Sequence, residues 1–395
     1  MTRISFFVHD LAANPIVRAA ALASAMSRDY EVELLGFLHS GELVYAPYRD
    51  RFIYKTLSVP LDTLDVVRAI PKLAEMATGS IVYACKPLVT SLGPALWRAR
   101  IAGRAPLFLD VEDDEWVAPH DGPADFAWRH VVKGWRHATA WKYTRAIHPL
   151  VRCADGVSVS TRRLQRRYGG TIVRHGPDGD RFNPEARELT NAAACRARWR
   201  LPEGAPLVLF AGVPQPHKGW HVLLDALQRP DAQAWHLVLA GARDHHDFAE
   251  AQRLLGRRCH SLGLIANDDM PSLLAAVDAV AVPQLDTPFA RTQLPAKILE
   301  AMAMARAVVA TTIGDLPEIL GGGARGFLVP PDDGQALASA FHHIAADPAA
   351  SRARGRAARA WFLEEASVAE MRRRLTRVFV ESRVIGRSER RHAAA

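Results

Sequence analysis

Short apolar runs alternate with amphipathic stretches along the whole chain. Apolar runs rich in branched residues, such as Ile4–Val8, Pro206–Gly212 and Val308–Thr311, predict buried strands. Stretches with apolar residues at helical spacing separate them, and Ile16–Ser27 is the first of these. Further strands are predicted at Glu31–Phe37, Ile81–Ala84, Leu107–Val111, Gly156–Ser160, Trp235–Gly241 and Ala279–Val282. Alternating strands and helices form right-handed parallel units, so the pattern predicts the α/β fold class.

The length of 395 residues favours two domains. A turn-rich segment, Ile172–Pro184, separates two halves that each alternate strand and helix, so we expect two doubly wound Rossmann-like domains facing across a cleft. The expected divisions are an N-terminal domain at 1–174, a C-terminal domain at 175–366, a helix at 367–382 that crosses back to the first domain, and a disordered basic tail at 383–395.

The stretch Pro283–Pro317 contains a proline-punctuated loop, a short helix at Ala296–Ala305 and a buried strand. Pro295 suits a helix start, because its missing N–H would have no partner there. The start of the helix therefore offers unpaired amides and a positive dipole end to an anion. Glu300 lies near enough to bind a sugar hydroxyl of a nucleotide held at that end. The alternative is an ordinary amphipathic helix of any α/β domain.

A second anion site is predicted after the strand Pro206–Gly212. The loop that follows ends in Lys218-Gly219 and leads directly into a helix at Trp220–Leu227. A strand, a Pro/Gly loop and a helix start form a phosphate site, to which Lys218 adds a positive charge. The loop is not a Walker loop, because GxxxxGK[ST] is absent.

These stretches resemble glycosyltransferase family 4, whose members are retaining, sugar-nucleotide-dependent enzymes of the GT-B fold. The resemblance covers residues 172–331 and rests on Lys218-Gly219, Lys297, Glu300-Ala301-Met302-Ala303, the strand ending at Thr311, and Gly326-Phe327-Leu328-Val329. Several positions depart from the family pattern, including His175 and Pro177, which replace Asn and Val at the crossing between the domains. Val213 replaces an Arg, Gln293 replaces an acidic residue, and Asn14-Pro15 stands where relatives have paired glycines.

The resemblance implies a retaining transfer of a sugar from a nucleotide-diphosphate sugar to an acceptor hydroxyl, in cell-envelope glycan, glycolipid or secondary-metabolite biosynthesis. It assigns catalysis to Lys218 and Glu300, and donor binding to Lys218, Arg243, Thr292, Gln293, Leu294, Lys297 and Glu300. It implies no metal and no cofactor, because cations and amides hold the diphosphate in this family. Two alternatives stay open. One is a non-catalytic relative that binds a nucleotide or partner, and the other is another enzyme on the same architecture, such as a nucleotide-sugar epimerase or a phosphorylase.

The acceptor is expected on the first domain, where acidic residues follow a predicted strand. Five acids fall within Asp110–Glu115. The acceptor-side residues proposed from the sequence are His9, Asn14, Glu112 and Asp113. The acceptor would be a sugar, a lipid-linked molecule or a small molecule. The alternative is a solvated acidic loop that caps the next helix.

Charge and cysteine content bear on partners and compartment. The formal net charge of +8 favours anionic partners, but no Lys/Arg run with interleaved aromatics supports nucleic acid. Four isolated cysteines and the lack of an N-terminal signal pattern predict a cytoplasmic protein. Trp128 and Trp135 share a face of a basic helix predicted within 126–151, which suggests peripheral contact with the inner face of the membrane. An ordinary surface helix is the alternative.

Overall fold

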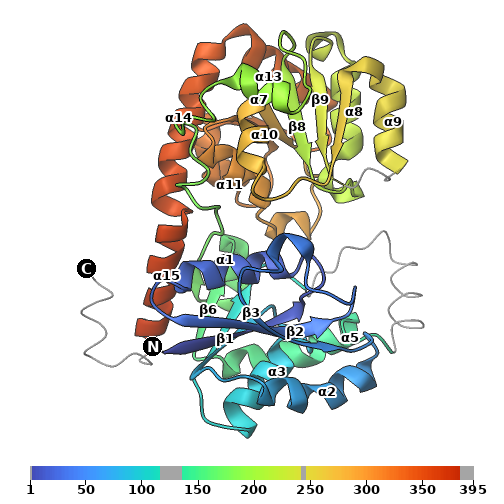
Figure 1. The fold of residues 1–395 in the computed structure, drawn as a ribbon. Helices are drawn as coiled ribbons and strands as arrows, with labels where there is room; N and C mark the ends of the chain where they lie inside the picture. The colour runs from blue at the N-terminus through green and yellow to red at the C-terminus, as the bar shows by residue number, and fades with distance from the viewer. Residues whose placement is uncertain (1, 116–135, 242–245, 383–395) are drawn as a thin grey trace. The chain divides into compact units, whose positions relative to one another are not determined.

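The computed structural model describes residues 2–115, 136–241 and 246–382 (Figure 1). They form two compact units. The first runs to His175 and includes the residues from Val368 onward, and the second is Gly176–Ser367. The predicted basic tail lies outside the described residues, as does the segment 126–135 of the predicted Trp helix. Among the described helices, none is both long and apolar enough to cross a membrane.

The first unit contains a seven-stranded sheet in the order β3-β2-β1-β4-β5-β6-β7, in which all recorded pairings are parallel. Its strands are β1 (Arg3–Asp10), β2 (Glu31–Leu38), β3 (Ile53–Ser58), β4 (Ile81–Cys85), β5 (Leu107–Val111), β6 (Gly156–Val159) and β7 (Thr171–Ile172). Its helices are α1 (Ile16–Met26), α2 (Thr63–Glu75), α3 (Leu92–Leu96), α5 (Trp141–Ile147), α6 (Arg162–Tyr168) and α15 (Val368–Glu381).

Helices cover both faces of this sheet (Figure 1). Ile4, Phe6 and Val8 of β1 pack in one cluster with α1 and α15. Phe7, between them in the sequence, packs in the other cluster with α2 and α3. Because successive side chains of a strand point to opposite faces, a continuous apolar run requires a helix layer on each side. The predicted doubly wound arrangement is therefore confirmed for this unit.

The second unit contains a six-stranded parallel sheet in the order β10-β9-β8-β11-β12-β13. Its strands are β8 (Leu207–Ala211), β9 (His236–Ala240), β10 (Cys259–Gly263), β11 (Ala279–Val282), β12 (Ala307–Thr311) and β13 (Phe327–Val329). Its helices are α7 (Ala192–Arg198), α8 (Trp220–Gln228), α9 (His246–Leu255), α10 (Met270–Ala276), α11 (Ala296–Ala303), α12 (Leu316–Ile319), α13 (Gly334–Ala346) and α14 (Pro348–Glu365).

This sheet is also covered on both faces. Leu207 and Leu209 of β8 pack with α7, α10, α11 and α14, and Val208 and Phe210 pack with α8, α9 and α13. In each sheet the first strand of the unit, β1 or β8, lies beside a strand that comes much later in the chain. Each sheet therefore has a switch point, β1/β4 or β8/β11, outside whose carboxyl ends a ligand crevice is expected.

Two predicted helices differ from the structure. Within the described part of 126–151, the helix is confined to α5, and a 3-10 turn with Pro149 follows it at His148–Cys153. Proline lacks an N–H and cannot continue an α-helical bond pattern. Helix α11 ends at Ala303, because Ala305 has φ +52° and the Arg306 amide donates back to the Ala301 carbonyl. Glycine usually provides such an ending, so the sequence gives no sign of it.

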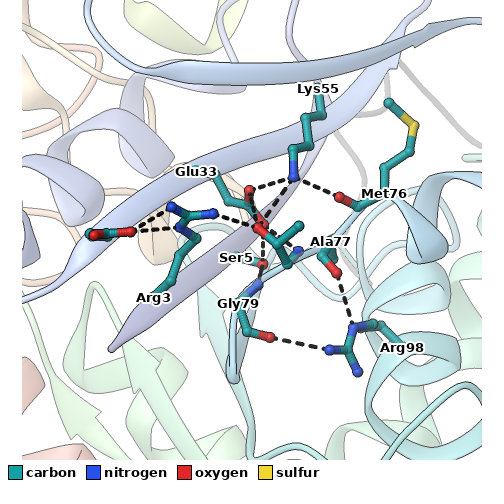
Figure 2. A network of polar contacts seen from close by, with 10 residues as sticks. Arg3, Ser5, Glu33, Lys55, Met76, Ala77, Gly79 and Arg98 are labelled. Atoms are coloured by element: carbon teal, nitrogen blue, oxygen red, sulfur yellow. Dashed lines mark hydrogen bonds and ion pairs between the residues drawn. The ribbon is translucent and has the colours of Figure 1, made fainter. Parts of the chain in front are cut away.

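A buried ion-pair network holds the amino ends of the first strands of the first unit together (Figure 2). The carboxylate of Glu33, on β2, accepts hydrogen bonds from Ser5 of β1 and from the amide and hydroxyl of Thr78. The Lys55 ammonium, on β3, lies 2.7 Å from the same carboxylate. Gly79 follows Thr78, and a β-carbon there would lie 2.5 Å from the Ser5 hydroxyl. The network is remote from the carboxyl ends of the strands, which suits a structural role.

Candidate functional site

The switch point of the second unit gathers the loops that follow β8 and β11. The Leu285 amide, after β11, donates to the His217 carbonyl, after β8, at 2.9 Å. Gly219 has φ +66°, and a β-carbon there would lie 1.7 Å from the Pro283 carbonyl oxygen. Only glycine allows the two loops to approach this closely. Gly219 thereby fixes the position of Lys218, the residue before it.

Two lysines approach the carboxyl end of β8 from different elements. A β-carbon built on Gly212 would lie 3.8 Å from Lys218 Nζ and 3.9 Å from Lys297 Nζ. Lys218 donates to the Val213 carbonyl at 2.8 Å, and the Lys297 ammonium lies 4.5 Å from the centre of the Phe210 ring. Neither ammonium has an ion-pair partner within 4.0 Å among the described residues. The pair is therefore available to an anion.

Burial is the main cause of the pKa shifts of the two lysines. Burial lowers the pKa of Lys218. Burial, followed by repulsion from Lys218, lowers the pKa of Lys297 to about 7, although Glu300 acts in the opposite direction. Two like charges in a desolvated site are unfavourable unless a ligand neutralises them. A diphosphate would do this.

Glu300 lies one helical turn after Lys297 on α11. Burial raises the pKa of its carboxyl group, and the charges of Lys297 and Arg181 oppose that shift. The Arg181 guanidinium is itself held by the Asn267 carbonyl and by an ion pair of 2.8 Å with Asp268. The Glu300 carboxylate makes no direct hydrogen bond or ion pair with another described residue, so its oxygens are available to ligand hydroxyls.

Two of the three backbone amides predicted to bind the donor before α11 are not free in the structure. Those of Thr292 and Gln293 donate to the carbonyls of Phe289 and Ala290 within a 3-10 turn, so they are already engaged. The helix begins at Ala296, with Pro295 as its N-cap. Leu294 is buried. The amides of Leu294, Ala296 and Lys297 have no hydrogen-bond partner among the described residues, so the predicted donor at Leu294 stays available and two further amides join it.

Gln293 takes part in an amide pair rather than standing alone. The Gln284 side chain donates from Nε2 to Gln293 Oε1 at 3.4 Å. The buried Gln284 Oε1 has no hydrogen-bond partner among the described residues. The position that is acidic in the resembled family is thus neutral here, and a neighbouring amide oxygen is left to accept a hydrogen bond. Arg243, the other predicted donor-binding residue, lies outside the described residues.

A buried ion pair lies at the switch point of the first unit. Arg18 of α1 donates from Nε and Nη2 to both carboxylate oxygens of Asp110, at 2.9 and 2.7 Å. Ser158 donates to the same carboxylate, and the Tyr83 hydroxyl lies 2.7 Å from the Ser158 hydroxyl. Arg18 Nη1 and the buried His175 Nδ1 have no partner among the described residues. The pair fixes the end of β5 and so the start of the acidic loop.

Lys86 forms close ion pairs with some carboxylates of the acidic loop and not with others. Its ammonium lies 2.8 Å from Asp113 and 2.7 Å from Glu115, but 3.9 Å from Glu112. Lys86 adopts φ +80°, which is uncommon for a residue other than glycine. Glu112 also lies 3.9 Å from His175 Nε2. Its carboxylate therefore stands among basic groups without a direct hydrogen bond from either of them.

Burial, and next the charge of Asp113, raise the pKa of Glu112 to about 7. Burial, and next His39, lower the pKa of His9 to about 3, so His9 is neutral at physiological pH. The His9 ring bonds to the Thr90 hydroxyl through Nδ1 at 2.7 Å. Asn14 is exposed in the turn before α1. Among the four predicted acceptor-side residues, Glu112 is the best placed to accept a proton near neutral pH.

Sequence reasoning did not single out Arg18, Lys86 or His175 as parts of this cluster. A usable signal was present for Arg18, which is a single charge within the apolar stretch Ile16–Met26, whereas its partner Asp110 opens a run of acids and is not distinguished from them. Charges in such settings are expected to find one another, because an isolated buried charge is costly. No comparable local signal marks Lys86, which reaches the acidic loop only because β4 and β5 are neighbours.

Residues 205–347 match the family model described as Glycosyl transferases group 1. D-inositol 3-phosphate glycosyltransferase of Streptomyces avermitilis is 30% identical over 202 residues, which are 47% of this chain and 41% of that protein. 2-Deoxystreptamine glucosyltransferase of Streptomyces kanamyceticus is 28% identical, over 57% of this chain and 62% of that protein. The chain thus spans about half the length of the curated relatives it matches.

Solved structures extend the likeness in fold to nearly the whole chain. HepE of Anabaena, in complex with UDP-glucose, superposes with a TM-score of 0.72 at 19% identity, covering 96% of this chain and 100% of that one. A glycosyltransferase from Rickettsia africae gives 0.72 at 16% identity, covering 96% and 98%. The fold is that of the GT-B glycosyltransferases, and the resemblance found in the sequence is confirmed.

Proposed function

We propose that this chain, whose second unit carries a glycosyl transferases group 1 domain, is a glycosyltransferase that moves a sugar from a nucleotide-diphosphate sugar to an acceptor hydroxyl. The observation that carries the proposal is the convergence of Lys218 and Lys297 at the β8/β11 switch point, with Glu300 one turn further along α11. Two curated relatives that match part of the chain are named as glycosyltransferases.

In the transfer, the bond between the sugar and the diphosphate breaks and negative charge grows on the leaving oxygen. Lys218, Lys297 and the amides at the start of α11 would stabilise this charge from a partly buried site. Glu300 would accept hydrogen bonds from the ribose hydroxyls and so fix the nucleotide. The same two cations supply the charge that a divalent metal supplies elsewhere, which supports a metal-independent reaction.

The acceptor would bind on the first unit, at the carboxyl ends of β1, β4 and β5. Asp113 and Glu115 are engaged by Lys86, whereas Glu112 is not. Glu112 would therefore receive a hydrogen bond from the acceptor hydroxyl. Retention of the anomeric configuration belongs to the proposal through the family resemblance, with a donor phosphate oxygen taking the acceptor proton.

A cytoplasmic location also belongs to the proposal, and four free cysteines support it. The hypothesis of membrane contact through the Trp helix stays a prediction, because both tryptophans at its predicted apolar face lie outside the described residues.

The first test is a thermal-shift panel with UDP, GDP, ADP and dTDP, each with EDTA and with a divalent metal. A ligand that binds the native state raises the melting temperature by mass action. We expect one nucleotide to give a clear shift that EDTA does not remove. No shift with any nucleotide would contradict the proposal, and a shift that requires metal would contradict its metal independence.

The variant Glu300→Gln tests the ribose assignment. We expect it to weaken binding of that nucleotide by about 10-fold or more, because a hydrogen bond to a charged group contributes about 1.5–3 kcal/mol. Glu318→Gln, a change on α12 of the same unit, is the matched control and should leave binding unchanged. Equal affinity in the Glu300 variant and the parent would remove Glu300 from the donor site.

A second candidate function is nucleotide binding without catalysis. It is favoured by Val213, which is 38% exposed where the resembled family has a cation, and by the neutral Gln284–Gln293 pair. Incubation of the protein with the matching nucleotide sugar decides between the two. Release of nucleoside diphosphate, with or without an added acceptor, supports catalysis, and binding without any release supports the alternative.

A further inference from the structure

A cavity of about 480 Å³ opens at the amino ends of the strands of the second unit. Its lining includes residues that directly precede four strands: Pro206 before β8, Trp235 before β9, Asp278 before β11 and Arg306 before β12. Lys218, Lys297 and Glu300 belong to loops and helices that follow the carboxyl ends of the same sheet. A five-residue strand spans about 16 Å, so the cavity and the donor site are separate.

The arginine side chains that line the cavity differ in whether they have ion-pair partners. Arg196 is fully engaged, because its guanidinium binds Asp278 and the carbonyls of Ala276, Pro202, Glu203 and Ala205. Asp278 is engaged as well, by Arg196 and the Leu207 amide. Arg196 and Asp278 therefore neutralise each other and are held in place, so neither charge is available to a ligand.

Arg306 has no carboxylate of its own among the described residues. Its Nε donates to the Met304 carbonyl and its Nη1 to the Val277 carbonyl, at 3.0 and 3.4 Å. The third nitrogen of the guanidinium, Nη2, has no hydrogen-bond partner among the described residues. Burial lowers the pKa of Arg306, with Asp278 opposing the shift from beyond ion-pair distance. A partly buried cation without a counter-charge in contact is unfavourable, so it favours an anion in the cavity.

Two further donors come from the first turn of α14. Ser351 is 7% exposed and lines the cavity, and its hydroxyl has no hydrogen-bond partner among the described residues. Arg352 follows it, lines the cavity and makes no ion pair with a described residue. Asp347 is occupied in capping the helix through the Ala350 amide. Glu203, at the exposed rim, offsets one of the cavity's charges.

We propose that this cavity binds a phosphate monoester with an apolar substituent, held by Arg306, Ser351 and Arg352. Arg306 and Arg352 have no carboxylate in contact, and with Glu203 at the rim the lining keeps one net positive charge, which favours an anionic group such as a phosphate monoester. Arginine also suits phosphate because its planar fork can donate two parallel hydrogen bonds. The rest of the lining is mostly apolar, with Pro206, Ile344 and Pro348, and it suits the substituent.

The test is calorimetric titration of the full chain with phenyl phosphate, with benzyl alcohol as the probe for apolar contact alone. We expect phenyl phosphate to bind and benzyl alcohol not to bind detectably. Arg352→Gln should weaken phenyl phosphate binding about 10-fold, and Ser351→Ala by several-fold. Arg356→Gln, one turn further along α14 and outside the lining, is the matched control and should bind as the parent does.

Lys218→Gln separates this cavity from the donor site, because phenyl phosphate binding should persist in that variant whether or not the proposed sugar transfer is correct. Binding that is lost in Lys218→Gln but kept in Arg352→Gln would overturn the proposal, as would no binding or equal affinity in all variants. Vesicles containing phosphatidic acid identify the source of the monoester. Sedimentation of the parent but not of Arg352→Gln points to a lipid headgroup, and phenyl phosphate binding without sedimentation points to a free metabolite.

Discussion

Lys218 and Lys297 bring their ammonium groups to the same glycine, within 3.8 and 3.9 Å of the position that a β-carbon on Gly212 would occupy. The two lysines come from different elements, a loop after β8 and the first turn of α11. Their proximity, added to burial, lowers the pKa of Lys297 to about 7. The charge of the proposed donor site therefore changes within the physiological pH range.

We expect binding of the nucleotide sugar to weaken as pH rises above about 7, by up to about tenfold per pH unit. The diphosphate favours protonated Lys297, so the pKa is higher in the complex than in the free protein, and binding takes up a proton over this range. Calorimetric affinities at about pH 6, 7, 8 and 9 measure the effect. The doubly esterified diphosphate of the ligand does not itself titrate there.

Lys297→Arg is the control, since arginine keeps its charge throughout this range. It should bind the nucleotide sugar with little pH dependence. A pH dependence as steep in this variant as in the parent would mean that another group titrates.

Activity at saturating donor should rise with pH through about 7, because the ionised Glu112 carboxylate is the stronger acceptor of the hydrogen bond from the acceptor hydroxyl. Glu112→Gln should lower the rate by about 10–100-fold, because a hydrogen bond to a charged group contributes about 1.5–3 kcal/mol, and it should abolish the rise, since an amide does not titrate. Initial rates across the pH range measure both effects.

The comparison for Glu112 is Asp113→Asn, which removes a carboxylate already paired with Lys86. This variant should keep the rise but move it to lower pH, because the charge of Asp113 contributes to the raised pKa of Glu112. A rise preserved in Glu112→Gln would exclude Glu112 from this role.

Glu33→Gln should destabilise the protein by about 2–4 kcal/mol at neutral pH, somewhat less than for a fully buried pair, because Lys55 is partly exposed. Burial opposes ionisation of Glu33, but the bonds from Lys55, Ser5 and Thr78 outweigh it and lower its pKa. Its stabilising contribution is therefore full above the unfolded pKa of about 4.3 and is lost as pH falls through the folded value. Urea unfolding of parent and variant at several pH values measures this.

The matched control is Glu31→Gln, two residues earlier on the same strand, whose ion pair with Arg3 is exposed. It should cost less than about 1 kcal/mol. If Glu33→Gln and Glu31→Gln lowered the free energy of unfolding equally, burial would not explain the stabilising contribution of Glu33.

Gly219→Ala should destabilise the second unit by about 2–5 kcal/mol and abolish nucleotide binding, because a left-handed backbone and a clash with the Pro283 carbonyl add together. Gly256→Ala has a similar φ of +54° but no heavy atom within 4 Å of the added carbon. It should cost only about 1–2 kcal/mol and leave binding intact. Thermal melts with and without the nucleotide measure both. An equal loss of stability in the two variants would mean that the contact between Gly219 and the Pro283 carbonyl is not close.

Local patterns in the sequence determined much of the architecture. Apolar runs such as Ile4–Val8 had to be strands covered on both faces, since their side chains alternate between the two sides of a sheet. Lys218-Gly219 and the helix bearing Glu300 were recognisable because each is a short contiguous stretch. Where the ends of elements depended on backbone geometry without a sequence signal, as at Ala305, the prediction extended the helix too far.

Only the tertiary structure decided which charges meet. Arg18 and Asp110 are 92 positions apart, and the sequence does not show that they form one buried pair. Nor does it show that Lys86 engages Asp113 and leaves Glu112 without a direct partner, or that Lys218 lowers the pKa of Lys297. Electrostatic effects depend on distance and burial, which are set by the order of strands in each sheet, and the chain specifies that order only through the packing of all its elements together.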